Sequence, residues 1–126
     1  MRSYTLDTGA LIALERRKSR MLALLGAAAR DRRCITVPVV TLVEWWRGAS
    51  SARDRILASK FIVLEVLTPR LAKLAGDAIA AVPGATAIDA VVMASAAQRG
   101  DIVLTSDIDD LEALRAVFPD VRVLGV

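Results

Sequence analysis

Four acidic residues occupy positions in this sequence where a carboxylate could do chemistry. Asp7 ends the apolar run SYTL, and Asp107 follows the run IVLTS. Glu44 and Asp89 lie inside the otherwise apolar segments VVTLVEWW and TAIDAVVMA. A carboxylate carried into an apolar environment costs several kcal/mol unless a cation or hydrogen-bond donors meet it. One cation from solution, bound by several of these acids, would offset that cost.

The rest of the composition restricts the chemistry to carboxylates. The sequence has no histidine, which excludes serine–histidine–aspartate triads, histidine zinc sites and histidine-based cleavage of RNA. Cys34 is the only cysteine, so neither an intrachain disulfide nor a thiolate zinc cluster can form. A ligand set made only of oxygen favours Mg²⁺ or Mn²⁺ over zinc. Such ions, held by carboxylates, are typical of sites that hydrolyse phosphodiesters.

Each acid also has a structural explanation, and these alternatives stay open. Asp7 and Asp107 precede helical patterns, where aspartate is a common N-cap. Glu44 has Arg47 three residues later, which is the spacing of a helical ion pair. Asp89 has only apolar side chains at the following helical neighbour positions, so no structural partner is evident for it. Asp89 therefore gives the sharpest test of a metal site.

The elements that must position these acids alternate between strands and helices. Short β-branched runs predict strands, and the apolar spacing between them predicts helices. We expect strands at residues 3–7, 34–38, 61–66, 102–105 and 121–126, and helices at about 9–17, 19–32, 39–47, 52–60, from 69 onward, 86–99 and 108–116. This alternation indicates an α/β fold with a central parallel sheet flanked by helices on both faces. Ligands bind such sheets outside the carboxyl ends of the strands.

The length and hydropathy indicate one domain. The 126 residues fit a single domain, residues 1–126, with no repeat or linker to divide them. No apolar stretch approaches the roughly 20 residues of a membrane span. An acid at position 7 interrupts the apolar run that a signal peptide needs. We therefore expect a cytoplasmic protein with no membrane partner.

Taken together, the acidic segments resemble a known family. LDTGALIAL, VVTLVEWWRG, TAIDAVVMASAAQRG and IVLTSDIDDLEAL look like the four acidic blocks of PIN-domain ribonucleases, particularly the VapC toxins of bacterial type II toxin–antitoxin pairs. The blocks occur in the family's order across essentially the whole chain. This resemblance implies a PIN-domain fold and an endoribonuclease that hydrolyses RNA with Mg²⁺ or Mn²⁺. It also implies that the catalytic, metal-binding acids are Asp7, Glu44, Asp89 and Asp107.

The same resemblance implies partners and auxiliary groups. Thr8 and Thr105 would be hydroxyls that orient a ligand water or a phosphate, with helix capping as an equal alternative. Asp110 would be an auxiliary acid, and Asp109 is expected on the solvated side of its helix. The expected partners are RNA, a cognate VapB-type antitoxin and a second copy in a homodimer, which together give a toxin–antitoxin hetero-oligomer. The antitoxin's C-terminal segment would fill an apolar groove beside the first two helices.

Positive charge is consistent with a polyanionic partner. The net charge is +3, which by itself is a weak signal. At least one of Trp45 and Trp46 is expected in the core. The candidates for RNA phosphate contacts are Arg16, Arg17, Arg30, Arg32, Arg33, Arg47, Arg53 and Arg55.

Other functions remain open on the sequence. A housekeeping RNA-processing PIN nuclease would share the site but would have no antitoxin gene beside its own. A non-catalytic α/β binding module would use the acids as caps and salt bridges and would show no saturable Mg²⁺ or Mn²⁺ binding. An aspartate-dependent phosphatase is disfavoured, because Gly9 stands where a second acid would be needed two residues after Asp7.

Overall fold

A computed structural model describes residues 3–126 as one parallel sheet with helices packed on it. The strands of this range are β1 (Tyr4–Leu6), β2 (Ile35–Pro38), β3 (Ile62–Glu65), β4 (Ile102–Thr105) and β5 (Arg122–Gly125). They lie in the order β3-β2-β1-β4-β5, and every neighbouring pair is parallel. The predicted parallel α/β architecture is therefore confirmed.

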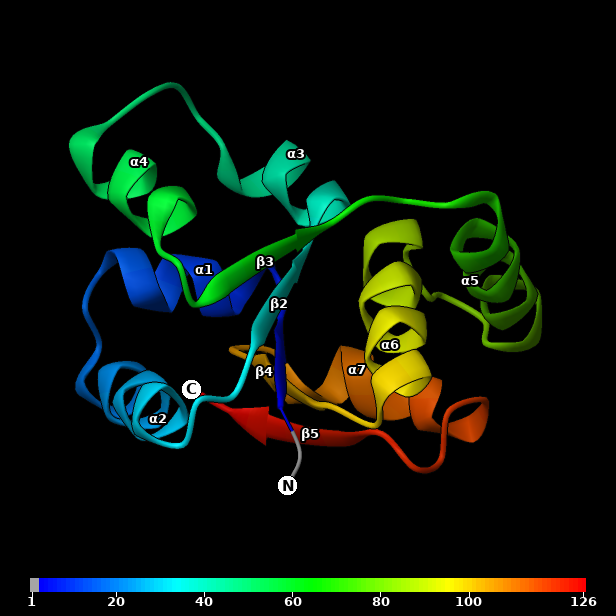
Figure 1. Ribbon diagram of the computed structural model, residues 1–126. Coiled ribbons are helices and arrows are strands. Elements are labelled where there is room, and N and C mark those ends of the chain that lie inside the picture. The colour runs from blue at the N-terminus through cyan, green and yellow to red at the C-terminus, as the bar shows by residue number, and fades with distance from the viewer. Residues whose placement is uncertain (1–2) are drawn as a thin grey trace.

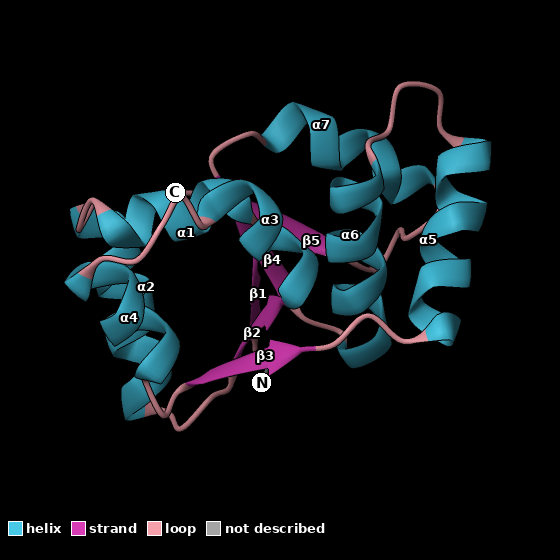
Figure 2. Ribbon diagram, turned by 90° about the horizontal axis from the view of Figure 1, so that it is seen from above, coloured by secondary structure: helices cyan, strands magenta, loops and turns pink. Residues whose placement is uncertain are grey.

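Helices join successive strands and cover both faces of the sheet (Figure 1). One face carries α1 (Thr8–Glu15), α2 (Ser19–Arg30) and α4 (Ser51–Ala58), and the other carries α5 (Pro69–Ala81), α6 (Ala87–Arg99) and α7 (Ile108–Ala113). The view from above shows the same two layers on either side of the strands (Figure 2). The connections also contain the short helix α3 (Leu42–Trp45) and two 3₁₀ turns, η1 (Val39–Thr41) and η2 (Leu114–Ala116). Within residues 3–126, no helix is both long and apolar enough to cross a membrane.

The apolar core has two layers because strand side chains alternate between the faces of the sheet. In β4, Val103 packs with the residues of α5 and α6, whereas Leu104 packs with those of α1 and α2. Leu6 of β1 lies in the same layer as Leu104 and is fully buried. Burial of apolar side chains on both faces fixes the register of the central strands.

Several helix ends follow the sequence signals that predicted them. Pro69 begins α5, and the side chain of Thr68 caps this helix by accepting a hydrogen bond from the backbone of Leu71. Gly100 ends α6 at a φ of 72°, a left-handed conformation that glycine adopts without strain. Local residue chemistry therefore determines where α5 begins and where α6 ends.

The segment 39–47 departs from the prediction of one mostly buried helix. It forms the turn η1 and the four-residue helix α3, and the chain leaves the helical conformation at Trp46, where ψ is 104°. A helix this short buries only one side, so Trp45 is 2% exposed while Val43 is 80% exposed. Glu44 lies on the exposed side. The expectation that Glu44 is carried into the interior is therefore wrong.

The order of the strands creates a switch point between β1 and β4. From β1 the chain builds outward through β2 to β3, and then it returns to place β4 on the other side of β1. Leu6 pairs with Leu104, so the carboxyl ends of these two strands lie side by side. The helices that follow them, α1 and α7, leave toward opposite faces (Figure 1). Open parallel sheets bind ligands in the crevice that this divergence leaves.

Candidate metal centre

Asp7 and Asp107 both lie at the switch point, and Thr105 joins them. Asp7 follows β1 directly, and its backbone N–H donates a hydrogen bond of 3.2 Å to the carbonyl of Leu104. The side chain of Thr105, the last residue of β4, hydrogen-bonds to the carboxylate of Asp7. The same hydroxyl accepts a 2.9 Å hydrogen bond from the backbone N–H of Asp107. The prediction that these two aspartates share one edge of the sheet is confirmed.

Asp7 is a buried carboxylate among other negative charges. Its side chain is the N-cap of α1 and accepts a 2.8 Å hydrogen bond from the backbone N–H of Ala10, so the capping alternative holds for this residue. Burial raises the pKa of Asp7 to about 6, against the opposing effects of the hydrogen bonds from Thr105 and Ala10. The charges of Asp89 and Asp107 contribute smaller parts of the same increase in pKa. Ionised Asp7 is therefore in an unfavourable environment that a cation would relieve.

Asp89 lies in the first turn of α6, where it also has a structural partner. Its backbone N–H donates a 3.2 Å hydrogen bond to the hydroxyl of Thr86, and its carboxylate hydrogen-bonds to the same side chain. The side chain of Thr86 caps α6 and also meets the carboxylate of Asp89, so the inference that Asp89 lacks a structural partner is wrong. Burial raises the pKa of Asp89 despite that hydrogen bond, and the charges of Glu44 and Asp107 add to the shift.

Glu44 reaches the same group of acids from the exposed side of α3. Its carboxylate accepts a 2.8 Å hydrogen bond from the hydroxyl of Thr8, the first residue of α1. In the described chain, Glu44 and Arg47 form no ion pair, so the structure does not support that alternative. The negative charge of Glu44 raises the pKa of Asp89, so Glu44 belongs to the same group of interacting acids. We call Asp7, Glu44, Asp89 and Asp107 the acidic cluster.

The segment 107–110 contains Asp107 of the acidic cluster and two further aspartates, Asp109 and Asp110. Asp107 occupies the N-cap position of α7 but makes no side-chain capping hydrogen bond in the described chain. A hydrogen bond with Asp107 and the charge of Asp107 raise the pKa of Asp110, and the charge of Asp89 adds to this. Asp109 is exposed, as predicted for the solvated side of the helix. Asp110 therefore experiences the negative charge of the acidic cluster.

A glycine that the sequence analysis did not assign to the site sets the approach of its two strand ends. A Cβ atom on Gly9 would collide with the hydroxyl of Ser106 and would lie 3.1 Å from the backbone nitrogen of the same residue. Rotation of the serine side chain would relieve the first contact, but the second would still require a shift of a few tenths of an ångström between the start of α1 and the β4–α7 connection. These two segments carry Asp7 and Asp107. The signal in the sequence was the glycine two residues after the first acid.

The donors of the acidic cluster suit a hard divalent cation. All four are carboxylates, and within residues 3–126 none of them forms an ion pair with lysine or arginine. In the same range, no three acidic, cysteine or histidine side chains stand close enough to hold one ion between them. Mg²⁺ usually binds through one or two carboxylates and keeps several of its waters. This open arrangement therefore fits Mg²⁺ or Mn²⁺ better than an ion that needs a closed set of protein ligands.

Comparisons with known proteins identify the family of this chain and other structures with the same fold. The PIN domain family profile matches residues 4–116. Among curated proteins, no sequence matches this chain. Similar structures include VapBC2 of Rickettsia felis bound to a promoter DNA fragment (12% identity, 98% of each chain, TM-score 0.75), a toxin–antitoxin complex from Klebsiella pneumoniae (18%, 97% of this chain and 96% of the other, 0.73) and DNA-bound VapBC of Salmonella typhimurium (19%, 99% and 98%, 0.70). At these identities the similarity establishes the fold alone.

Proposed function

Because this chain belongs to the PIN-domain family, we propose that it is a metal-dependent endoribonuclease and the toxin of a type II toxin–antitoxin pair. The observation that carries the nuclease proposal is the acidic cluster: the helices α3 and α6 supply two of its carboxylates, and the segments that follow β1 and β4 supply the other two. Carboxylates gathered without a neutralising base are what a site for Mg²⁺ or Mn²⁺ requires. The toxin role rests on the likeness to the VapBC folds, and the proposed location is the cytoplasm.

In this proposal, the acidic cluster holds one or two divalent ions, directly or through water. A bound ion there supplies an activated water and stabilises charge on the attacked phosphate and the leaving oxygen. Thr8 holds the carboxylate of Glu44, and Thr105 holds that of Asp7, so both hydroxyls keep acids in place. Asp110 lies next to Asp107, and its negative charge would add to the attraction of the acidic cluster for a cation. Neither histidine nor cysteine is needed for this hydrolysis.

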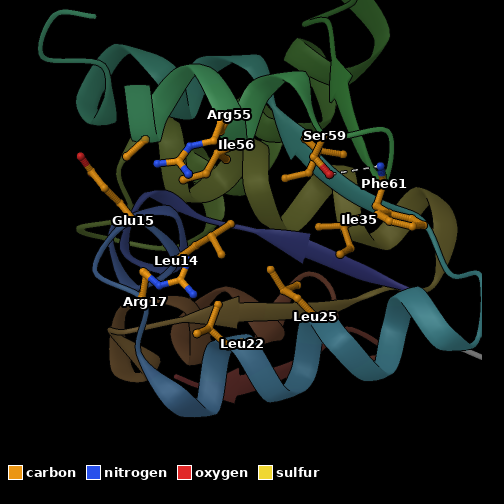
Figure 3. A pocket seen from close by; sticks show the side chains of 12 residues that line it. Leu14, Glu15, Arg17, Leu22, Leu25, Ile35, Arg55, Ile56, Ser59 and Phe61 are labelled. Carbon is orange, nitrogen blue, oxygen red and sulfur yellow. Dashed lines mark hydrogen bonds between the residues drawn. The ribbon is translucent and has the colours of Figure 1, made fainter. Parts of the chain in front are cut away.

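An apolar pocket supports the proposed antitoxin partner. The groove expected beside the first two helices is present as a pocket of about 280 Å³. Figure 3 shows Leu14, Leu22 and Leu25 lining it together with the charged residues Glu15, Arg17 and Arg55. An amphipathic segment with apolar anchors suits such a groove. The similar solved structure from Klebsiella pneumoniae is a toxin–antitoxin complex, which favours an antitoxin segment as the occupant.

A second exposed apolar surface supports the proposed homodimer. β3 is an edge strand of the sheet, and large apolar side chains on and after it are exposed to solvent. Val63, Leu64, Val66 and Leu67 are 46%, 41%, 66% and 43% exposed. Several large apolar side chains exposed along one edge of a sheet favour an interaction site over a solvated edge. A second copy of the chain is the proposed occupant.

The nuclease proposal is tested by incubating the purified protein with a long single-stranded RNA. We expect cleavage with Mg²⁺ or Mn²⁺ and none after chelation with EDTA, and sequencing of the new ends would identify the cleavage sites. Absence of both cleavage and saturable Mn²⁺ binding would favour the non-catalytic binding module. Cleavage without growth arrest in the host, with the protein soluble, would favour the housekeeping nuclease.

A further inference from the structure

A second, more polar pocket adjoins the acidic cluster. Its volume is about 290 Å³, and its charged lining consists of Arg16, Arg47, Arg53, Glu15 and Glu44. Glu44 belongs both to this pocket and to the acidic cluster, so the two sites share a wall. The lining residues come from α1, α3, α4 and the segments that follow α1 and α3. Only the tertiary structure gathers them, and we call this site the arginine pocket.

One acid of the arginine pocket is already neutralised. The carboxylate of Glu15 accepts a 3.1 Å hydrogen bond from the indole nitrogen of Trp45 and forms a 2.9 Å ion pair with Arg53. Arg53 also donates a 3.0 Å hydrogen bond to the carbonyl of Gly48. Its Nε atom is buried without a hydrogen-bond partner in the described chain. Arg53 and Glu15 therefore form a fixed wall with little net charge.

The other two arginines retain their positive charge. Arg16 and Arg47 are exposed, and within residues 3–126 neither side chain makes a hydrogen bond or ion pair. Two unpaired guanidinium groups that line one pocket favour an anion between them. The planar fork of arginine donors matches the geometry of a phosphate. The arginine pocket thus offers a cationic site next to an acidic one.

The juxtaposition matters because an acidic centre by itself repels RNA. Phosphate contacts with lysine and arginine dominate the affinity of proteins for nucleic acids. Because Glu44 belongs to both sites, an RNA strand with one phosphate at the acidic cluster could place a neighbouring phosphate at the arginine pocket. An acidic peptide could also satisfy two arginines, but it would have no reason to pass over the acids. The position of the pocket therefore favours the substrate strand.

We propose that Arg16 and Arg47 bind an RNA backbone phosphate adjacent to the one that is cleaved. This proposal rests on the proposed nuclease function and assigns two of the eight candidate arginines to the substrate. It requires that these side chains contribute to substrate binding and not to the metal site. The two roles differ in their effects on KM and kcat.

The experiment compares two double variants with the same loss of charge. Arg16→Gln with Arg47→Gln removes the pocket cations, whereas Arg70→Gln with Arg122→Gln removes two exposed arginines on α5 and β5 as the control. Cleavage of a fluorescent single-stranded RNA in Mn²⁺ gives KM and kcat at several KCl concentrations. Thermal melting with and without Mn²⁺ checks folding and the metal site. All four substituted arginines are exposed or lie outside the core, so we expect both variants to fold.

We expect the pocket variant to raise KM about tenfold or more with kcat within about twofold of the wild type, since charge-assisted hydrogen bonds are lost. The dependence of log KM on log salt concentration should weaken by about 0.7 for the lost phosphate contact. The control should change KM less than about twofold, because its charges are distant and screened. The stabilisation by Mn²⁺ should be the same in all three proteins.

Other results would overturn the proposal. Equal KM values for the two double variants would show that the pocket is not a substrate site, while wild-type cleavage would leave the nuclease function intact. Loss of kcat together with the Mn²⁺ stabilisation would place the arginines in the metal site. Inhibition by oligoglutamate that disappears in the pocket variant while its KM for RNA is unchanged would assign the pocket to an acidic peptide. A wild-type protein that cleaves no RNA would remove the nuclease function and this proposal together.

Discussion

The hydroxyl of Thr8 donates a 2.8 Å hydrogen bond to the carboxylate of Glu44, across 36 residues of sequence. The bond joins the first residue of α1 to the exposed acid of α3. Asp7 caps the same helix, so the position of Glu44 is tied to that of the buried acid. An exposed glutamate has several rotamers open to it, and this hydrogen bond selects one. Thr8 therefore acts as a positioning residue for the acidic cluster.

Replacing Thr8 tests this positioning role. We expect Thr8→Val to lower the affinity for Mn²⁺ and the rate of RNA cleavage about 10- to 100-fold, as for other groups that orient metal ligands. The free energy of unfolding should change by less than about 1 kcal/mol, because the hydrogen bond is solvent-exposed. Thr8→Ser keeps the hydroxyl and should stay close to the wild type. Calorimetric titration with Mn²⁺ measures the affinity, and equal affinities for the two variants would contradict the prediction.

Asp89→Asn tests the charge of the half-buried acid. The variant keeps the shape of the side chain and can still hydrogen-bond to Thr86, but it loses the charge that a metal needs. We expect cleavage and Mn²⁺ affinity to fall together by at least about 100-fold. Without metal, stability should be unchanged or higher, because repulsion by Glu44 and Asp107 is relieved. Asp109→Asn, in the first turn of α7, is the matched control. Comparable metal-dependent cleavage by all three proteins would remove Asp89 from the site.

The raised pKa of Asp7 predicts how stability depends on pH in the metal-free protein. Its pKa is about 6 in the folded state and 3.8 in the ordinary case. Between these values the folded protein binds a proton that the unfolded chain has released. The free energy of unfolding should therefore fall by about 3 kcal/mol as the pH rises from about 4 to above 6. Acidification should stabilise the fold in this window.

Urea denaturation in EDTA at pH 4, 5, 6 and 7 measures this effect. Asp7→Asn is the reference, because asparagine is an equally good N-cap but does not titrate. We expect the difference in stability between the wild type and this variant to change with pH in the direction given above. Saturating Mn²⁺ at pH 7 should restore the stability of the wild type and not that of the variant. Parallel pH profiles for the two proteins would refute the assignment of a raised pKa.

The apolar pocket can be closed without touching the acidic cluster. Ala52 of α4 lines it, and Ala52→Phe would place a ring in the space that an antitoxin segment needs. We expect RNA cleavage and growth arrest to persist while the neutralising effect of the cognate antitoxin falls about tenfold or more, because the apolar anchors lose their burial. Ala58→Phe, on the same helix but exposed, is the control. Full neutralisation of the Ala52 variant would place the antitoxin elsewhere.

A polar network that the sequence did not reveal lies under the sheet at the end of α6. The guanidinium of Arg99 donates hydrogen bonds to Asp101 at 2.8 Å, to Ser95 at 2.8 Å, to Thr5 at 3.0 Å and to Glu65. Ser95 belongs to α6, Thr5 to β1 and Glu65 to β3, and Asp101 directly precedes β4. One arginine therefore joins β1, β3 and the residue before β4 to the helix whose first turn carries Asp89.

Arg99→Met should destabilise the protein by about 3 kcal/mol, because it leaves Asp101 as a buried charge without a cation. The side chain of Asp101 is only 3% exposed. Arg115→Met removes the arginine of an exposed pair with Glu112 and should cost less than about 1 kcal/mol. Chemical denaturation measures both values. Similar small losses in the two variants would mean that the buried network contributes little.

Local sequence signals were sufficient to predict most elements of the fold. Capping residues, Pro69 and Gly100 act through their own backbone conformations, and alternating apolar residues act through burial of a whole face. These signals operate within a few residues, so the strands and helices lie close to their predicted ranges. The predicted helix at 39–47 failed because its length depends on how the chain passes the edge of the sheet. Propensity does not encode that path.

The placement of the four acids was likewise only partly predictable from the sequence. Asp7 and Asp107 were predictable as neighbours, because the carboxyl ends of adjacent parallel strands must meet. The exposed position of Glu44, its hydrogen bond with Thr8 and the contact of Asp89 with the side chain of Thr86 were not predictable. Each depends on how a helix packs against the sheet, which local sequence does not determine.

What the sequence by itself determined is the alternation of elements and the chemical character of the site, since both follow from residue types and their local spacing. What only the tertiary structure decided is which side chains meet across the chain. Arg16 and Arg47 lie 31 positions apart and on different segments, yet they line one pocket. The physical reason is that β1 and β2 are parallel neighbours, so the segments that follow them, which contain α1 and α3, begin at the same edge of the sheet.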